Sequence, residues 1–209
     1  MINAKNFLGQ CLLAIALAGN ALAVMAAPTS YHVAVNTAGL SGTGSLDMFL
    51  GSGTSALALT ATLSNFSANF GAVDPAFSGD YTVEPGGSFS LVNGSGYNDL
   101  TRFLNLGGTA SFDVAFSGAF IDAAGSEGGL FTVGLYDENG NFVGNPLGIA
   151  SIELVATSPT AFNIAFEPGL ASVTAITASA VPEPSALLMM MTGLGLVGFI
   201  ARRRNATGV

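Results

Sequence analysis

The sequence predicts an all-β domain, a β-sandwich, because glycine, aromatic and β-branched residues dominate its middle and because short alternating segments recur there. Residues 28–181 contain 22 glycines, 13 phenylalanines and all four tyrosines. Few strong helix formers accompany them, and this composition favours short strands joined by glycine turns. Seven or more strands in one domain of this length imply two packed sheets.

The first predicted strand covers residues 31–35, where apolar and polar side chains alternate before a turn at residues 36–39. Similar patterns recur further along the chain. They predict strands at residues 56–66, 87–92, 109–120, 130–136, 149–156 and 161–166. We expect a jelly-roll-like sandwich, with an immunoglobulin-like topology as the alternative, because the sequence does not determine the order of the strands.

Two of these segments predict which side chains face the core. Successive side chains of a strand point to opposite faces of the sheet. The predicted core positions are Phe112, Val114, Phe116, Ile152 and Leu154, and the predicted solvent-facing positions are Asp113 and Glu153. Each sheet would then have one buried face and one wet face.

Asn139 and Gly140 lie between two apolar segments and predict a β-hairpin, in a turn whose two central positions both have positive φ. Asp137, Asn139 and Asn141 alternate in the manner of a calcium-binding loop. An EF-hand requires a bidentate glutamate at the twelfth position, which is Gly148, so that interpretation fails. An ordinary polar turn and a looser calcium site shared with another loop remain as alternatives.

Residues 1–26 have the layout of a secretory signal peptide. Lys5 precedes an apolar stretch, and small residues follow it, so that cleavage after Ala23 or Ala26 is expected. Removal of this segment also removes Cys11, the only cysteine of the chain. We therefore expect that disulfide bonds do not stabilise the mature protein.

Three parts follow one another at the C-terminal end. They are the motif Val181, Pro182, Glu183 and Pro184, an apolar run over residues 186–201, and the cluster Arg202, Arg203 and Arg204. The prolines interrupt regular secondary structure. The apolar run predicts a single transmembrane helix, and the arginines predict a stop-transfer signal on the cytoplasmic side. The secreted domain is then residues 27–180, the C-terminal signal is residues 181–204, and the cytoplasmic tail is residues 205–209.

This tripartite end resembles the PEP-CTERM sorting signal of bacterial surface proteins. The resemblance implies that an exosortase, a membrane-embedded protease, cuts the chain near Glu183 after transient anchoring in the inner membrane. It implies a final location at the cell surface or in the extracellular matrix. Segments of the domain, among them residues 112–118 and 135–137, resemble a subgroup of these proteins whose β-rich domain has no established activity.

The charge of the predicted domain excludes one class of partner. Residues 28–181 contain twelve acidic residues and one basic residue, Arg102, which gives a formal net charge of −11. Such a surface repels the phosphates of nucleic acids and of anionic lipids, because it has almost no cations with which to release counterions. We therefore expect no nucleic-acid partner.

The sequence offers few candidates for catalysis. His32 is the only histidine and lies in a predicted strand, where we expect it to face solvent. No Gly-x-Ser-x-Gly or Walker motif occurs, and a mature chain without cysteine does not favour a tetrahedral zinc site. We expect no enzymatic activity, no catalytic residue and no cofactor, with Ca²⁺ as the one weak candidate.

Binding is better supported than catalysis. Tyr81, Tyr97 and Tyr136 lie beside turn-forming residues, where an exposed ring could stack on a sugar, although the chain has no tryptophan. We expect a structural or adhesive protein of a biofilm or floc, at the cell surface or in the exopolysaccharide matrix. A carbohydrate-binding or calcium-dependent binding module is the alternative. The expected partners are an exosortase and an extracellular polysaccharide.

Overall fold

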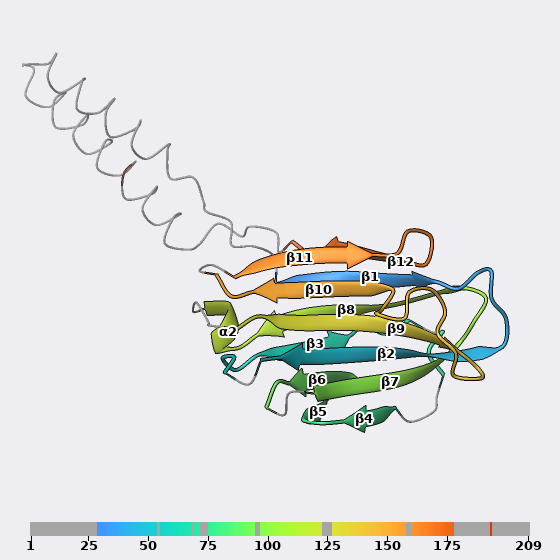
Figure 1. Cartoon of the computed structure of the whole chain (residues 1–209), viewed down its shortest axis with the longest axis horizontal. Coiled ribbons are helices and arrows are strands. Elements are labelled where there is room, and N and C mark those ends of the chain that lie inside the picture. The colour runs from blue at the N-terminus through green and yellow to red at the C-terminus, as the bar shows by residue number, and fades with distance from the viewer. Residues whose placement is uncertain are drawn as a thin grey trace, which may run out of the picture. The chain divides into compact units, whose positions relative to one another are not determined.

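The computed structural model describes residues 29–53, 55–67, 69–71, 75–94, 97–122, 127–157, 160–177 and 193. Its strands form two antiparallel sheets of six strands each, which pack face to face as a sandwich (Figure 1). In order across the sheet, sheet A contains β12 (Ala171–Ala175), β1 (Ser30–Asn36), β8 (Thr109–Ser117), β3 (Thr60–Ser64), β6 (Ser88–Val92) and β5 (Tyr81–Glu84). Sheet B contains β11 (Ala161–Phe166), β10 (Ala150–Val155), β9 (Gly129–Asp137), β2 (Thr43–Ser52), β7 (Tyr97–Asn105) and β4 (Ala76–Ser78).

The strand order confirms the predicted jelly roll. β1 pairs with β8, β3 pairs with β6 and β2 pairs with β7, so one sheet contains the run 1-8-3-6 and the other the run 2-7-4. This interleaving of early and late strands in two sheets is that of a jelly roll. β5 joins sheet A beside β6, β9 to β11 widen sheet B, and β12 widens sheet A. The immunoglobulin-like alternative is not the topology found.

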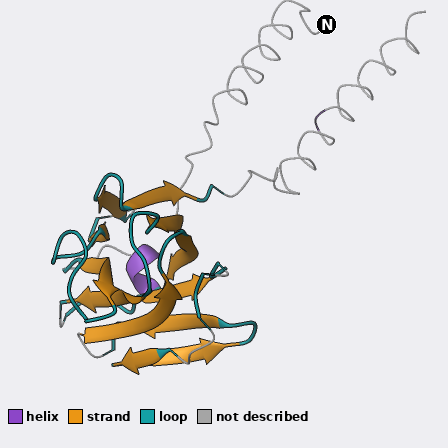
Figure 2. Ribbon diagram, turned by 90° about the vertical axis from the view of Figure 1, so that its right-hand side faces the viewer, coloured by secondary structure: helices purple, strands orange, loops and turns teal. Residues whose placement is uncertain are grey.

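All seven predicted strands are confirmed, and two of them are shorter than predicted by three residues or more. The segment predicted at residues 56–66 forms a strand only over Thr60–Ser64, and the segment predicted at 109–120 ends at Ser117. Gly118 then turns the chain with a φ of 106°, and a Cβ there would collide with the Ala58 carbonyl. The chain continues into the short helix α2 (Ala119–Asp122), which Figure 2 shows among the strands of the two layers. The strands β2, β4, β5, β7 and β12 were not predicted.

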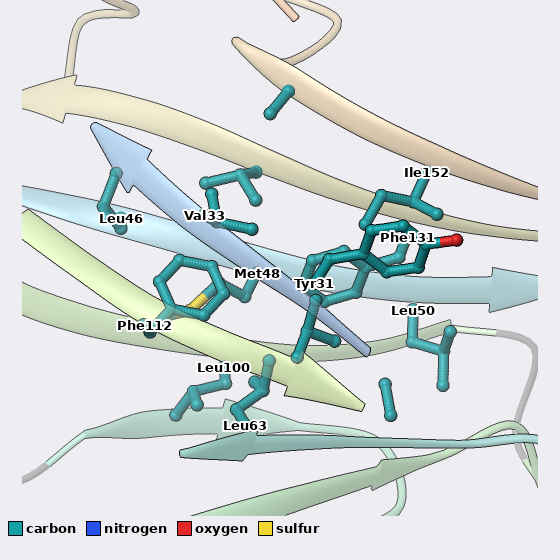
Figure 3. Packing of buried hydrophobic residues seen from close by; sticks show 14 of the residues in the cluster. Tyr31, Val33, Leu46, Met48, Leu50, Leu63, Leu100, Phe112, Phe131 and Ile152 are labelled. Carbon is teal, nitrogen blue, oxygen red and sulfur yellow. The ribbon is translucent and has the colours of Figure 1, made fainter. Parts of the chain in front are cut away.

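The core lies between the two sheets and is built from the alternating inward side chains of both. Figure 3 shows Val33, Leu63 and Phe112 of sheet A together with Met48, Leu100 and Phe131 of sheet B, all of them buried. Burial of each such side chain stabilises the fold by roughly 1.5–3 kcal/mol. The predicted core positions Phe112, Val114, Phe116, Ile152 and Leu154 are all buried. Glu153 is exposed and Asp113 is partly exposed, as the alternation predicts.

The turn after β9 differs from the predicted one. Tyr136 forms a β-bridge with Phe142, so the chain does reverse here. The Gly140 amide donates a hydrogen bond to the Asp137 carbonyl at 3.0 Å, and Gly140 has a φ of 76°, whereas Asn139 does not have a positive φ. The turn therefore has a single left-handed residue, the arrangement of a type I turn followed by a glycine bulge. The expectation of two positive-φ positions was wrong.

The chain forms two compact units, and the boundary between them lies after Ile176. Within the part of the chain that the structure describes, no segment forms a helix with the length and hydropathy of a membrane span. The predicted signal peptide at residues 1–26, the motif Val181 to Pro184, the apolar run 186–201 and the arginine cluster 202–204 lie outside the described residues.

Candidate functional site

The outward side of sheet B gathers aromatic rings and carboxylates on three neighbouring strands. β2 is the central strand, with β7 on one side and β9 on the other. Because side chains alternate along each strand, the residues between the buried positions point away from the core. We call this surface the β2–β7–β9 face, and its residues include Ser45, Asp47 and Phe49 of β2, Tyr97, Asp99, Thr101 and Phe103 of β7, and Thr132, Gly134 and Tyr136 of β9.

An aromatic pair lies at one end of this face. The ring centroids of Phe49 and Tyr97 are 4.8 Å apart with an angle of 46° between the rings, and Tyr97 is 57% exposed. Tyr97 pairs with Gly51 in the register of β2 and β7. The ring of Phe49 covers Gly51, where an added Cβ would lie only 2.5 Å from the Phe49 Cζ atom. The Phe49 ring can therefore occupy this position only because residue 51 has no side chain.

A second aromatic pair lies towards the other end of the same face. The centroids of Tyr136 and Phe142 are 4.6 Å apart, and Phe142 is 50% exposed. The Tyr136 ring lies over Gly134, because a Cβ at that position would be 3.2 Å from the Tyr136 Cε2 atom. Gly134 is the residue of β9 that pairs with Asp47 of β2. The Tyr136 ring thus leans towards the middle of the β2–β7–β9 face.

Two carboxylates lie between the aromatic pairs. Asp47 accepts a hydrogen bond from the Thr101 hydroxyl at 3.3 Å. Partial burial raises the pKa of Asp47, and the negative charge of Asp99 raises it further, whereas the bond from Thr101 lowers it. Partial burial also raises the pKa of Asp99, whereas hydrogen bonds from the backbone of Ser78 and of Asp99 lower it. The Oδ1 atom of Asp99 is buried and has no hydrogen-bond partner among the described residues.

The charges of these carboxylates contribute to the pKa values of the two tyrosines on the face. Partial burial raises the pKa of Tyr97, with further contributions from the charges of Asp99 and Asp47. The pKa of Tyr136 is raised by burial first and then by Asp47, Tyr97 and Asp99. Both phenols therefore keep their protons at neutral pH. The face offers aromatic surface and hydrogen-bond acceptors side by side, which is what a polyhydroxylated ligand can use.

A hollow of about 560 Å³ adjoins the Phe49–Tyr97 pair. Gly51, Gly128 and Gly129 line it where side chains would otherwise stand, and Phe49, Leu130 and Glu153 also border it. The Glu153 carboxylate accepts a hydrogen bond from the Asn163 amide at 3.0 Å, so a partner already orients it. The hollow extends the β2–β7–β9 face towards β10.

The three tyrosines named from the sequence do not form one site. Tyr97 and Tyr136 share the β2–β7–β9 face, but Tyr81 lies in β5 of sheet A. Its ring stacks on Phe77 with centroids 4.0 Å apart and an angle of 4°. Tyr81 is 46% exposed, as predicted, yet it covers the edge of the sandwich where β4 and β5 meet. It is therefore not part of the candidate site.

The loop with calcium-like spacing uses its carboxylate internally. The Asp137 Oδ1 atom accepts hydrogen bonds from the backbone amides of Asn139 at 2.9 Å and Asn141 at 2.8 Å. The Oδ2 atom accepts one from the Asn141 side chain at 3.1 Å, and these bonds lower the pKa of Asp137. Within the described ranges, no group of three or more His, Cys, Asp or Glu side chains could hold a metal ion. The geometry is that of a polar turn closed on itself.

His32 lies on the outward side of sheet A, as predicted. Its Nδ1 atom is 2.6 Å from Asp113 Oδ1, and the other oxygen of Asp113 accepts a hydrogen bond from Asn65 at 2.7 Å. These three side chains come from or follow β1, β8 and β3, which are adjacent strands. Asp113 is therefore a shared acceptor for two neighbouring segments, a role that the alternation pattern did not indicate.

Sequence reasoning missed Asp47, Phe49 and Asp99. The segment that contains the first two was not predicted as a strand. A signal was present, since Leu46, Met48 and Leu50 alternate with polar or aromatic residues and are all fully buried. Their alternation would have placed Asp47 and Phe49 together on an outward face.

The comparisons with known proteins identify the C-terminal end. Residues 180–204 match the model of the PEP-CTERM protein-sorting motif. The match includes Val181 to Pro184 and the three arginines, as the sequence predicted. No curated protein and no solved structure shows significant similarity to the chain.

Proposed function

We propose, from the premise that residues 180–204 carry a PEP-CTERM protein-sorting motif, that the chain is a structural or adhesive component of the cell surface or of an exopolysaccharide matrix. The motif marks a secreted surface protein that an exosortase processes, after transient anchoring in the membrane. This motif is the observation that carries the proposal, because it indicates that the jelly-roll domain is delivered to the cell surface or beyond it. The motif does not by itself assign the domain a task.

The jelly-roll domain supports an adhesive role through its β2–β7–β9 face. Tyr97 and Phe142 are large aromatic side chains that are 57% and 50% exposed. Exposed rings that gather on one surface with polar acceptors are typical of binding sites. In an exported matrix protein, we propose that polysaccharide is the partner of this face.

The proposed role requires no catalysis. His32 is bound to Asp113 across two strands, and we propose that the pair stabilises sheet A. A calcium-dependent version of the binding module is the second candidate from the sequence, based on Asp137, Asn139 and Asn141. The hydrogen bonds that already occupy the Asp137 carboxylate make this loop the weaker candidate.

The delivery step is tested by replacing Pro182, Glu183 and Pro184 together with alanine. We expect the full-length variant to remain in the inner membrane, while the parent reaches the surface without its C-terminal segment. Replacement of Asn205 and Thr207 with alanine is the matched control, because these residues lie outside the matched motif, and it should leave delivery unchanged. Mass spectrometry of surface material that recovers an intact 202–209 end would contradict the proposal.

The adhesive step is tested in cells. Deletion of residues 29–177, with the signal peptide and sorting signal retained, should reduce aggregation or biofilm cohesion. Cells with the alanine variant of His32 should behave like the parent. If the deletion leaves cohesion and surface texture unchanged, the structural or adhesive role is wrong. If His32→Ala removes a hydrolytic activity, the protein is an enzyme instead.

A further inference from the structure

We propose that the β2–β7–β9 face binds a neutral polysaccharide, in a stretch of several sugar units that runs across both aromatic pairs. This inference rests on the proposed function and names the ligand class and the residues that would recognise it. The ligand contacts the Phe49–Tyr97 pair, the Tyr136–Phe142 pair and the carboxylates between them.

The aromatic pairs supply the apolar contacts. A pyranose ring presents C–H groups on its faces, and these groups pack against the face of an aromatic ring. Tyr97 and Tyr136 are each held by a second ring, at 4.8 Å and 4.6 Å, so little side-chain entropy remains to be lost on binding. The two rings are therefore ordered before the ligand arrives.

The spacing of the pairs indicates a chain rather than a single sugar. Tyr97 pairs with Gly51 of β2, and Tyr136 pairs with Ser45 of the same strand. Six residues along a strand correspond to about 20 Å. The lean of Tyr136 over Gly134 shortens this distance, and we infer that the two aromatic pairs contact different sugar units of one chain.

The carboxylates supply acceptors for hydroxyl groups. Asp99 Oδ1 is buried without a hydrogen-bond partner in the described part of the chain. A buried acceptor without a donor is unfavourable, so a ligand hydroxyl that reaches it on binding would be favoured. The Asp47 carboxylate accepts a hydrogen bond from the Thr101 hydroxyl at 3.3 Å and can accept further hydrogen bonds. Sugar hydroxyls are donors that suit both positions.

Charge selects neutral polysaccharides over acidic ones. The only basic residue of residues 28–181 is Arg102, and it lies in β7 with its guanidinium over the rings of Phe66, Phe70 and Phe89. It alternates with Thr101, so it points to the inner side of sheet B and not to the β2–β7–β9 face. A uronate or sulfate group would face Asp47 and Asp99 without a compensating cation. Polyuronates should therefore be rejected.

Binding is tested with the full-length chain in detergent, by affinity electrophoresis through gels that contain a neutral glucan, mannan or galactan, or a polyuronate. We expect at least one neutral polymer, and not the polyuronate, to retard the parent protein. Tyr97→Ala and Tyr136→Ala should each weaken binding about tenfold. Tyr81→Ala is the matched control, because its ring stacks on Phe77 elsewhere, and it should bind like the parent. Thermal unfolding checks that each variant is folded, and Tyr97→Phe should retain binding if Tyr97→Ala does not fold.

Several results would overturn the inference. Equal retardation by the polyuronate would show that the ligand class is wrong, although polysaccharide adhesion would survive. Parent-like binding by both tyrosine variants would show that the face is wrong. Binding lost in a chelator would indicate a calcium bridge, release of reducing ends would indicate a hydrolase, and a dimer lost in Tyr97→Ala would indicate a self-association surface. If no neutral polymer binds but deletion of the domain still reduces cohesion, this inference fails and the proposed function stands.

Discussion

The imidazole of His32 and the carboxylate of Asp113 join β1 to β8 on the outward side of sheet A, with 2.6 Å between Nδ1 and Oδ1. The two residues are direct partners in the strand register. Asp113 also accepts a hydrogen bond from Asn65, the residue of positive φ that follows β3. One surface carboxylate thus holds the side chains of two neighbouring segments.

The first prediction concerns this carboxylate. The sequence alone suggested that Asp113→Ala costs little, because the residue faces water. With two partners lost, we expect a cost of about 1–2 kcal/mol in the free energy of unfolding. Urea unfolding of Asp113→Ala, His32→Ala and the double variant measures the coupling between the two residues. Strictly additive effects of the two substitutions would show that the hydrogen bond contributes nothing.

The second prediction concerns the core. Phe116 is 3% exposed, and its ring centroid lies 5.8 Å from Phe131 of the other sheet and 5.9 Å from Phe162. Phe116→Ala should destabilise the domain by about 3–5 kcal/mol, because it leaves a cavity between the sheets. Phe103→Ala, at a position that is 43% exposed, is the matched control and should cost less than about 1 kcal/mol. Similar effects from the two variants in urea unfolding would refute the assignment of faces.

The third prediction concerns Arg102. Its guanidinium lies 4.7 Å from the centroid of Phe66, its Nε atom is buried without a hydrogen-bond partner among the described residues, and burial lowers its pKa. Arg102→Met keeps apolar contact with the rings and removes a partly buried charge, so stability should change by less than about 1 kcal/mol. Arg102→Lys should be the less stable of the two, because a compact ammonium loses the stacked plane but keeps the charge. A reversed order in urea unfolding would show that the cation–π contact outweighs desolvation.

The fourth prediction concerns pH. The pKa values of Asp47 and Asp99 are raised in the folded state from 3.8, so the folded protein binds protons more tightly than the unfolded chain. The cost of these two charges is present at neutral pH and is relieved as the pH falls through the folded pKa values towards 3.8. Asp47→Asn should therefore raise the melting temperature at pH 7 and reduce this part of the pH dependence.

Asp137 provides the control for this measurement, because its pKa is lowered from 3.8 by hydrogen bonds from its own loop. Its contribution is present above 3.8 and is lost as the pH falls below it. Asp137→Asn should therefore not raise the melting temperature at pH 7. Any decrease should be small, because the group is exposed. A lower melting temperature in Asp47→Asn at pH 7 would contradict the sign of the Asp47 effect.

The sequence predicted strands well where alternation was strict. Around Phe112 and Ile152, side-chain alternation alone predicted the buried and exposed faces, because a strand that covers a core must alternate. Prediction was poorer for Thr43–Ser52 and Tyr97–Asn105, which contain glycine, aspartate and asparagine, residues of low strand propensity. In these two strands, tertiary contacts stabilise the extended conformation that the residues' own strand propensity does not favour. Asn98, for example, is fully buried because its side chain donates to the Leu50 carbonyl and accepts from the Asp80 amide.

The sequence by itself determined the sorting motif at residues 180–204, the all-β class and the faces of the regular strands. These properties depend on local order along the chain, such as an apolar run before arginines or a period of two. The tertiary structure decided that Tyr97 and Tyr136 share a face with Phe49, Asp47 and Asp99, while Tyr81 does not. This grouping depends on β2 lying between β7 and β9, strands that are far apart in sequence. Hydrogen-bonded pairing between distant strands follows the packing of the whole sandwich, so no local pattern could reveal it.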